Sequence, residues 1–173
     1  IWVKSGADKR KATSREEIQR LFQTSGMVHA DVMPVEGMTV GDLDMPYFRA
    51  FFQKRYGESL DDHNIPLEQT ITNLNLGKGG DLNLTCVLLF TQSPSSRLPS
   101  YIVKVAAFPG ESIATDSYLD SRDIIGKISD IFQQTVGFIL SNIRQIQGEQ
   151  GVNTIGEPEI PKLVLEELIV NAL

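Results

Sequence analysis

A glutamate and an asparagine lie one helical turn apart near the end of the sequence, where their side chains can act on one ligand. Glu167 and Asn171 belong to the amphipathic segment PKLVLEELIVNAL, and their spacing of four residues places both on one face of a helix. A carboxylate and an amide in these positions could have a chemical role instead of a structural one. The same pair on an amphipathic helix is more often solvated surface, so the residues alone leave both interpretations open.

The only concentrated positive region lies near the start of the chain. It consists of Lys4, Lys9, Arg10, Lys11 and Arg15. Such a cluster can bind the phosphates of a nucleic acid, or it can be an exposed, solvated connector. Both interpretations stay open. Trp2 could stack on a base, although a tryptophan in a strand more often belongs to the core.

Three further groups offer weaker chemistry. Cys86, the single cysteine, lies in the apolar run LTCVLLF and is expected to be a buried, inert thiol. Asp61, Asp62 and His63 follow one another in a polar loop. A metal site needs three or four convergent ligands, so these residues are expected to be solvated. The GKGG run at 77–80 has the wrong spacing for a phosphate-binding loop and is expected to be a turn.

Periodicity and turn residues predict the elements that would position these groups. Ser14 and Glu17 form a capping box for a helix that is expected to bury Ile18, Leu21 and Phe22. The other expected elements are a strand in 1–6, a polar connector in 7–14, extended segments near 29–37 and 152–155, a helix that starts at 39–42, a helix from Pro66, a short helix capped by Thr85, a strand within 100–110 and a final helix from Pro161.

A long helix is predicted from 124 to 147, because apolar residues recur there at helical spacing. Its length of about 24 residues corresponds to roughly 36 Å. Helices dominate and few strands are expected, so the fold class is predicted to be α+β (or α/β), helix-rich with a small sheet.

Composition limits the classes of protein that fit. The chain has 173 residues, is 41% hydrophobic and can bury a sizeable core without disulfides. Its net charge of −6 repels nucleic-acid backbones on average, so contact with DNA requires a local basic patch. No apolar stretch approaches the roughly 20 residues of a membrane span, so no membrane partner is expected. A lone cysteine fits a reducing compartment, and we expect a cytoplasmic protein.

Four stretches occur in a recognisable order: IWVKSGADKRKATSREEIQRLF, ITNLNLGKGGDLNLTCVLLFTQSP, YIVKVAAFPG and LEELIVNAL. Together they resemble a family of bacterial transcriptional regulators related to RecG ATP-dependent DNA helicases. The first resembles the end of an AlbA-like (Schlafen-type) domain, the next two an α/β connector, and the last the first ATP-site motif of a GHKL-type ATPase domain. The resemblance implies domains at 1–25, 26–150 and 151–173, the last one truncated, so we expect a fragment of a longer protein.

The resemblance also assigns roles. It implies that Glu167 is the catalytic base that polarises the attacking water and that Asn171 ligates Mg²⁺ at the nucleotide, whereas Glu166 lies one step off that face. ATP and Mg²⁺ would bind to the full-length parent, and no cofactor or activity is expected of this fragment. DNA would be a partner through the parent. Helicase activity is disfavoured, because strand-separation motors generally place a P-loop lysine on the phosphates.

The resulting hypothesis is a connector that couples a nucleic-acid-binding domain to an ATPase domain. The alternative is a protein-interaction or homodimerisation module with no dependence on nucleotide. A free-standing enzyme that uses Cys86 is the third and weakest interpretation.

Overall fold

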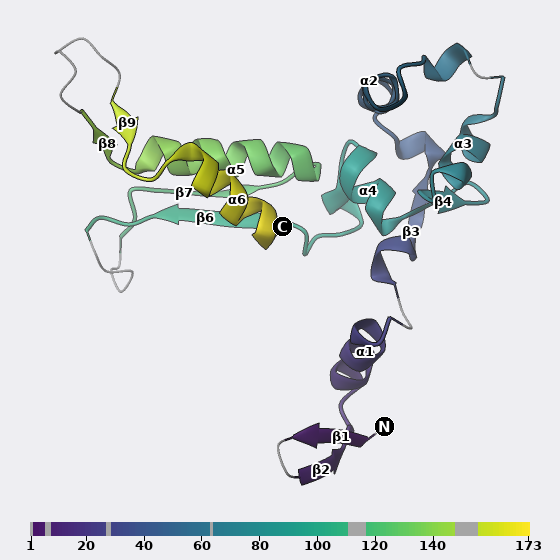
Figure 1. The fold of residues 1–173 in the computed structure, drawn as a ribbon, viewed down its shortest axis with the longest axis horizontal. Coiled ribbons are helices and arrows are strands. Elements are labelled where there is room, and N and C mark those ends of the chain that lie inside the picture. The colour runs from purple at the N-terminus through teal and green to yellow at the C-terminus, as the bar shows by residue number, and fades with distance from the viewer. Residues whose placement is uncertain (1, 6–7, 27–28, 63, 111–116, 148–155) are drawn as a thin grey trace.

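The chain folds as an N-terminal arm followed by two lobes (Figure 1). The computed structural model describes residues 2–5, 8–26, 29–62, 64–110, 117–147 and 156–173. We refer to 2–26 as the arm, to 29–98 as the first lobe and to 101–173 as the second lobe. Helices alternate with small antiparallel sheets across the described residues, which confirms the predicted α+β class.

The arm is a two-stranded hairpin followed by one helix. Strands β1 (Trp2–Ser5) and β2 (Asp8–Lys11) pair antiparallel, and α1 (Arg15–Thr24) follows. The prediction of a polar connector at 7–14 is therefore wrong for 8–11, which form β2, because charged residues can pair as a strand when both faces meet water. Gly6, at the end of the strand predicted in 1–6, lies outside the described residues.

Helix α1 begins where the sequence predicts, at the Ser14 cap. The Ser14 hydroxyl accepts a hydrogen bond from the Glu17 amide at 3.4 Å. The predicted burial of its apolar residues is wrong: Ile18 and Leu21 are half-buried and Phe22 is exposed. The physical reason is position, because the arm projects away from both lobes and no layer covers α1 (Figure 1).

The first lobe packs helices against a three-stranded sheet of order β3-β5-β4. Its elements are β3 (Pro34–Thr39), α2 (Met45–Tyr56), α3 (Leu67–Asn73), β4 (Gly77–Lys78), β5 (Asp81–Asn83) and α4 (Leu84–Phe90), with short 3-10 turns at Ala30–Val32, Val40–Asp42, Leu60–Asp62 and Pro94–Ser96. Phe48 of α2 meets Phe90 of α4 edge to face, with ring centroids 5.1 Å apart. Leu82 and Val87 complete the fully buried centre.

Two helix starts in this lobe differ from the prediction. Thr39 ends β3 and residues 40–42 form a 3-10 turn, so α2 begins only after Asp44, whose carboxylate accepts from the Tyr47 amide at 3.2 Å. Helix α4 forms as predicted, but its cap is Asn83, which accepts from the Cys86 amide at 2.9 Å. The Thr85 hydroxyl instead donates to the carbonyl of Asp31. Each displaced cap shows that several Ser, Thr, Asp or Asn residues compete for one helix start.

The second lobe stacks helices on a β-hairpin. Strands β6 (Val103–Ala107) and β7 (Asp120–Ile124) pair antiparallel, α5 (Ile128–Asn142) packs against both, and α6 (Lys162–Ala172) packs on α5 (Figure 1). Strands β8 (Gln145–Ile146) and β9 (Glu157–Pro158) form a short ladder. The buried apolar side chains of this lobe are Ile124, Ile131, Val136, Phe138, Leu165 and Ile169. The extended segment predicted at 152–155 lies outside the described residues.

The predicted helix at 124–147 is too long at both ends. Ile124 belongs to β7 and faces Val103 across the hairpin, and α5 starts only after Gly126, whose φ of +136° no helix contains. The helix ends at Asn142, before Gln145 and Ile146 pair with β9. Ile124 of the strand and the buried residues of α5 face the same core, so their apolar spacing imitates a single helix, although the β8 residues are exposed.

A partly buried ion pair joins the two lobes. The ammonium of Lys127, just before α5, donates to the carboxylate of Asp44 at the start of α2, with Nζ 2.7 Å from Oδ2. The same ammonium lies 3.5 Å from Asp130 and 5.0 Å from the centre of the Tyr47 ring. The Lys127 side chain is only 11% exposed, so this charge depends on Asp44 for compensation.

The contact shifts the pKa of each partner from its ordinary value. The hydrogen bond from Lys127, followed by that from the Tyr47 amide, lowers the pKa of the Asp44 carboxyl. The hydrogen bond to Asp44 raises the pKa of the Lys127 ammonium. The stabilisation from Asp44 is therefore present above the ordinary pKa of an aspartate and is lost as the pH falls through the lowered value. The stabilisation from Lys127 is present below the ordinary pKa of a lysine and is lost as the pH rises through the raised value.

We expect Asp44→Asn and Lys127→Met each to lower the free energy of unfolding by about 2 kcal/mol, the size of a hydrogen bond between charged groups with little exposure. Asparagine caps a helix as well as aspartate, so Asp44→Asn removes the ion pair and retains the cap. Urea unfolding measures each loss. The double variant should lose less than the sum, and Lys104→Met, which breaks an exposed pair with Asp123, should change little. Additive losses would show that the two groups do not interact.

Candidate nucleic-acid interface

The arm hairpin gathers most of the predicted basic residues on one face. In the antiparallel register Trp2 lies opposite Lys11 and Lys4 lies opposite Lys9. Because alternate residues of a strand point to the same side, these four side chains share one face of the hairpin. We call Trp2, Lys4, Lys9 and Lys11 the basic face. All four are exposed.

The basic face holds an unfavourable internal arrangement. Lys4 and Lys9 are directly opposite, and like charges in that position repel each other. No described acidic side chain forms an ion pair with Lys4, Lys9 or Lys11. An anion that lies across the hairpin would relieve the repulsion, so the arrangement favours a polyanionic ligand.

The remaining predicted basic residues lie elsewhere. Arg10 is on the opposite face of the hairpin, and its guanidinium binds the Glu17 carboxylate through two hydrogen bonds, at 2.5 and 3.0 Å. These contacts with Glu17 raise the pKa of Arg10. Arg15 is exposed in the first turn of α1. The structure thus assigns Arg10 to fixing the hairpin against α1, while Arg15 stays accessible beside it.

Charge is distributed unevenly along the chain. The first 20 residues hold six of the sixteen lysines and arginines and three of the 22 acidic residues, although the whole chain has a net charge of −6. The arm is therefore the basic part of an acidic protein. The arm also projects from the lobes (Figure 1). A phosphate backbone can therefore approach the arm and remain distant from the acidic lobes.

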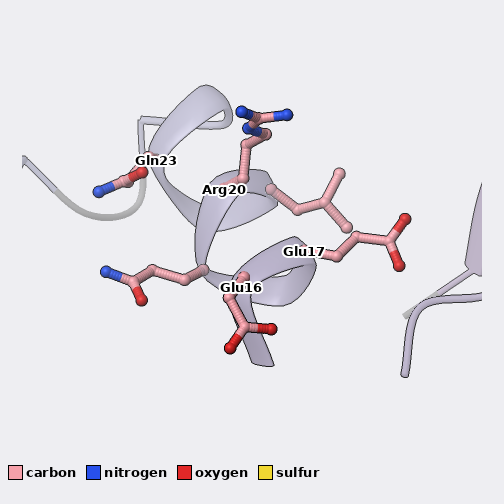
Figure 2. A pocket seen from close by; sticks show the side chains of 6 residues that line it. Glu16, Glu17, Arg20 and Gln23 are labelled. Atoms are coloured by element: carbon pink, nitrogen blue, oxygen red, sulfur yellow. The ribbon is translucent and has the colours of Figure 1, made fainter. Parts of the chain in front are cut away.

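The hollow beside α1 does not add a small-molecule site to the arm. It has a volume of about 600 Å³ and is lined by Glu16, Glu17, Gln19, Arg20, Leu21 and Gln23. Figure 2 shows that the labelled side chains Glu16, Glu17, Arg20 and Gln23 leave the helix in different directions. Ligand sites instead bring a few polar groups to one point, so this space is open helix surface.

The pair predicted from the end of the sequence lies on the outer face of α6. Leu165 and Ile169 pack inward, and Glu167 and Asn171 point away from α5 and are exposed. Neither side chain makes a hydrogen bond or ion pair with a described residue, whereas Glu166 pairs with Lys162 at 3.1 Å. The pair is thus free to meet a ligand. Oxygen donors of these two types suit Mg²⁺, so the residues fit as part of such a site.

Of the other groups singled out in the sequence, Asp61 pairs with Arg49 at 3.1 Å, and His63 lies outside the described residues. Within the described ranges, no three His, Cys, Asp or Glu side chains converge as metal ligands. Among the helices that the structure describes, none combines the length and apolar character that crossing a bilayer requires.

Cys86 is completely buried in the first lobe, and burial raises the pKa of its thiol to about 12. We therefore expect slow alkylation under native conditions, because the reactive thiolate is scarce and inaccessible. Mass spectrometry after iodoacetamide treatment at pH 8 measures the rate, with the urea-unfolded chain as the fast control. Rapid native labelling would restore the interpretation in which Cys86 is a nucleophile.

The sequence did not reveal the junction between the lobes. Asp44 and Lys127 are separated by 83 positions, and each has an ordinary local explanation as a helix cap and a loop lysine. Nor did it reveal the pairing register that separates Arg10 from Lys9 and Lys11. Residues 8–11 are one acidic and three basic residues in succession, so they carry no alternation that would indicate a strand.

No protein-family model, no curated protein and no solved structure matches the chain. The resemblance to RecG-related regulators, with the domain limits and the roles that it implies, therefore stays a prediction.

Proposed function

We propose that this chain is the connector of a DNA-binding, ATP-binding transcriptional regulator, in which it links a nucleic-acid contact on the arm to a nucleotide site on α6. The observation that carries the proposal is the basic face, where Lys4 and Lys9 oppose each other without an acidic partner. A two-stranded ribbon of this kind is narrow enough to enter a groove of DNA or to follow a single strand. Such a regulator would act in the cytoplasm.

The nucleic-acid contact should be weak and salt-dependent. Three lysines and the neighbouring Arg15 can neutralise only a few phosphates, and the rest of the chain is acidic. We therefore expect the dissociation constant to lie in the non-specific range, about 10⁻⁴ to 10⁻⁶ M, and affinity to fall as salt increases.

The junction between the lobes supports the coupling part of the proposal. Lys127 immediately precedes α5, α5 packs on α6, and Asp44 opens α2 in the first lobe, which continues from the arm. A movement of α6 that shifted α5 would act on the Asp44–Lys127 contact. Because Lys127 is nearly buried, separating its charge from Asp44 would be costly, so we expect this contact to transmit displacement between the lobes.

Lys4→Glu tests the nucleic-acid contact without weakening the fold. The substitution replaces a repulsive pair with an attractive one, so the hairpin should gain stability while binding is lost. We expect the affinity for a fluorescein-labelled oligonucleotide to fall at least about tenfold at 50 mM salt, and the slope of log affinity against log salt to fall by about 1. Anisotropy titration measures both quantities.

Lys54→Glu is the matched control, since Lys54 is exposed on α2 and the change in net charge is the same. Equal losses in the two variants would mean that net charge, rather than the basic face, governs binding. No binding of any oligonucleotide at low salt would refute the nucleic-acid part of the proposal.

The nucleotide site is tested in the full-length parent. When bound there, Mg²⁺ would neutralise phosphate charge, Asn171 would hold the ion and Glu167 would orient water. Glu167→Gln should keep nucleotide binding and reduce ATP turnover at least about 100-fold, within the usual contribution of a general base. Asn171→Ala should weaken Mg²⁺-dependent nucleotide binding.

Glu166→Gln is the matched control on the same helix, because Glu166 is turned toward Lys162. If Glu166→Gln and Glu167→Gln have the same effect, the assignment of Glu167 is wrong. A parent protein that neither binds nor hydrolyses ATP would remove the nucleotide site from the proposal.

A second candidate function, a protein-interaction or dimerisation module, is favoured by one observation. Several large apolar side chains of α6 are exposed: Leu163, Val164, Leu168 and Val170. They flank Glu167 and Asn171, and a covering protein layer would remove them from water. Sedimentation equilibrium separates the two candidate functions. A dimer that dissociates in the Leu168→Lys variant, together with a parent protein that does not respond to ATP, would favour the dimerisation module.

A further inference from the structure

The exposure of Trp2 is unusual for a tryptophan. It is the only tryptophan of the chain, it lies in β1, and 70% of its surface is open to solvent. The described residues include no aromatic or cationic side chain stacked on its ring. Leaving so large an apolar surface in water forgoes about 1.5–3 kcal/mol of burial. The ring is available to a ligand with a flat apolar face.

The neighbours of Trp2 specify the charge of that ligand. Lys11 is directly across the hairpin, and the Lys4–Lys9 pair is two residues further along, about 7 Å away at the usual rise of a strand. One aromatic ring and three ammonium groups therefore occupy one short surface. A nucleotide chain offers the complement, a flat base and a run of phosphates.

The back of the hairpin keeps this surface pointing outward. Arg10 and Val3 lie on the opposite face, and the Arg10–Glu17 ion pair attaches that face to α1. Lys9 and Lys11 could move to the face of Arg10 only if the strand pairing shifted by one residue. Such a shift would also break the Arg10–Glu17 ion pair. The basic face is thus held toward solvent.

We propose that the basic face prefers single-stranded nucleic acid over duplex, with one base stacked on Trp2 and the adjacent phosphates on Lys4, Lys9 and Lys11. The inference rests on the proposed nucleic-acid function and specifies its ligand. In a duplex the faces of the bases are covered by their neighbours, so Trp2 would gain nothing there. In a single strand every base has a free face, and stacking on an aromatic side chain tolerates any sequence.

The single tryptophan makes the test direct. The 173-residue chain is titrated at 50 mM salt with oligo(dT), with oligo(U) and with a duplex of the same number of phosphates, while the fluorescence of Trp2 is recorded. We expect either single strand to quench the emission and to bind at least about tenfold more tightly than the duplex. Equal affinity for duplex and single strands, or binding without quenching, would overturn the inference.

Variants of the ring give a second readout, by anisotropy of a labelled oligonucleotide. Trp2→Leu should weaken single-strand binding about 5- to 100-fold, as loss of one stacked base does, and leave duplex binding unchanged. Trp2→Phe should retain most of the affinity. Tyr118→Leu, which removes an aromatic side chain with 62% exposure from the second lobe, is the matched control and should have no effect.

The two proposals fail in different ways. If neither single strands nor duplex bind at low salt, the nucleic-acid function itself is wrong. A different outcome would refute only the single-strand preference: single strands and duplex bind equally, Lys4→Glu weakens the binding of both, and Trp2→Leu weakens the binding of neither. The basic face would then bind phosphate alone.

Discussion

One ion pair, between Asp44 and Lys127, links the two lobes, which also touch where α4 meets α5. Lys127 carries a nearly buried charge, and of the described carboxylates only Asp44 and Asp130 lie within ion-pair distance of it. Asp44 performs two tasks with two oxygens, since Oδ1 caps α2 and Oδ2 binds the lysine. The carboxylate that caps α2 in the first lobe is therefore also the ion-pair partner of the lysine that precedes α5 in the second lobe. Separating the lobes would leave the charge of Lys127 without Asp44, whereas the cap of α2 lies within the first lobe and would remain.

The arm follows a different physical principle. It has no buried core of its own beyond Ala12, and its order comes from a hairpin ladder, the Ser14 cap and the Arg10–Glu17 pair. Exposed ion pairs contribute little to stability, so such an element is expected to form reversibly. An arm of this kind suits a negatively charged ligand, because binding supplies the anionic partners that the lysines of the basic face lack. The proposed nucleic-acid contact and the loose attachment of the arm are thus consistent with each other.

Local signals in the sequence succeeded where the deciding interaction is local. The Ser14 cap, the short helix in LTCVLLF and the strand within 100–110 all form, because caps, apolar runs and β-branched residues act within a few positions. The helix predicted at 124–147 failed because Ile124 of β7 and the apolar residues of α5 face a shared core, and because the exposed Ile146 of β8 continues their spacing. Periodicity records which residues face that core and not how many elements supply them.

The candidate sites divide in the same way. The residue types in the sequence determined that the arm is basic, that the chain is acidic overall and that Glu167 and Asn171 share a helical face, since composition and a four-residue spacing suffice for each. Only the tertiary structure decided that Trp2 and three lysines share one exposed face while Arg10 turns to Glu17, because strand register is set by pairing. Only the tertiary structure joined Asp44 to Lys127, because a contact across 83 positions depends on the packing of both lobes and leaves no pattern in either segment.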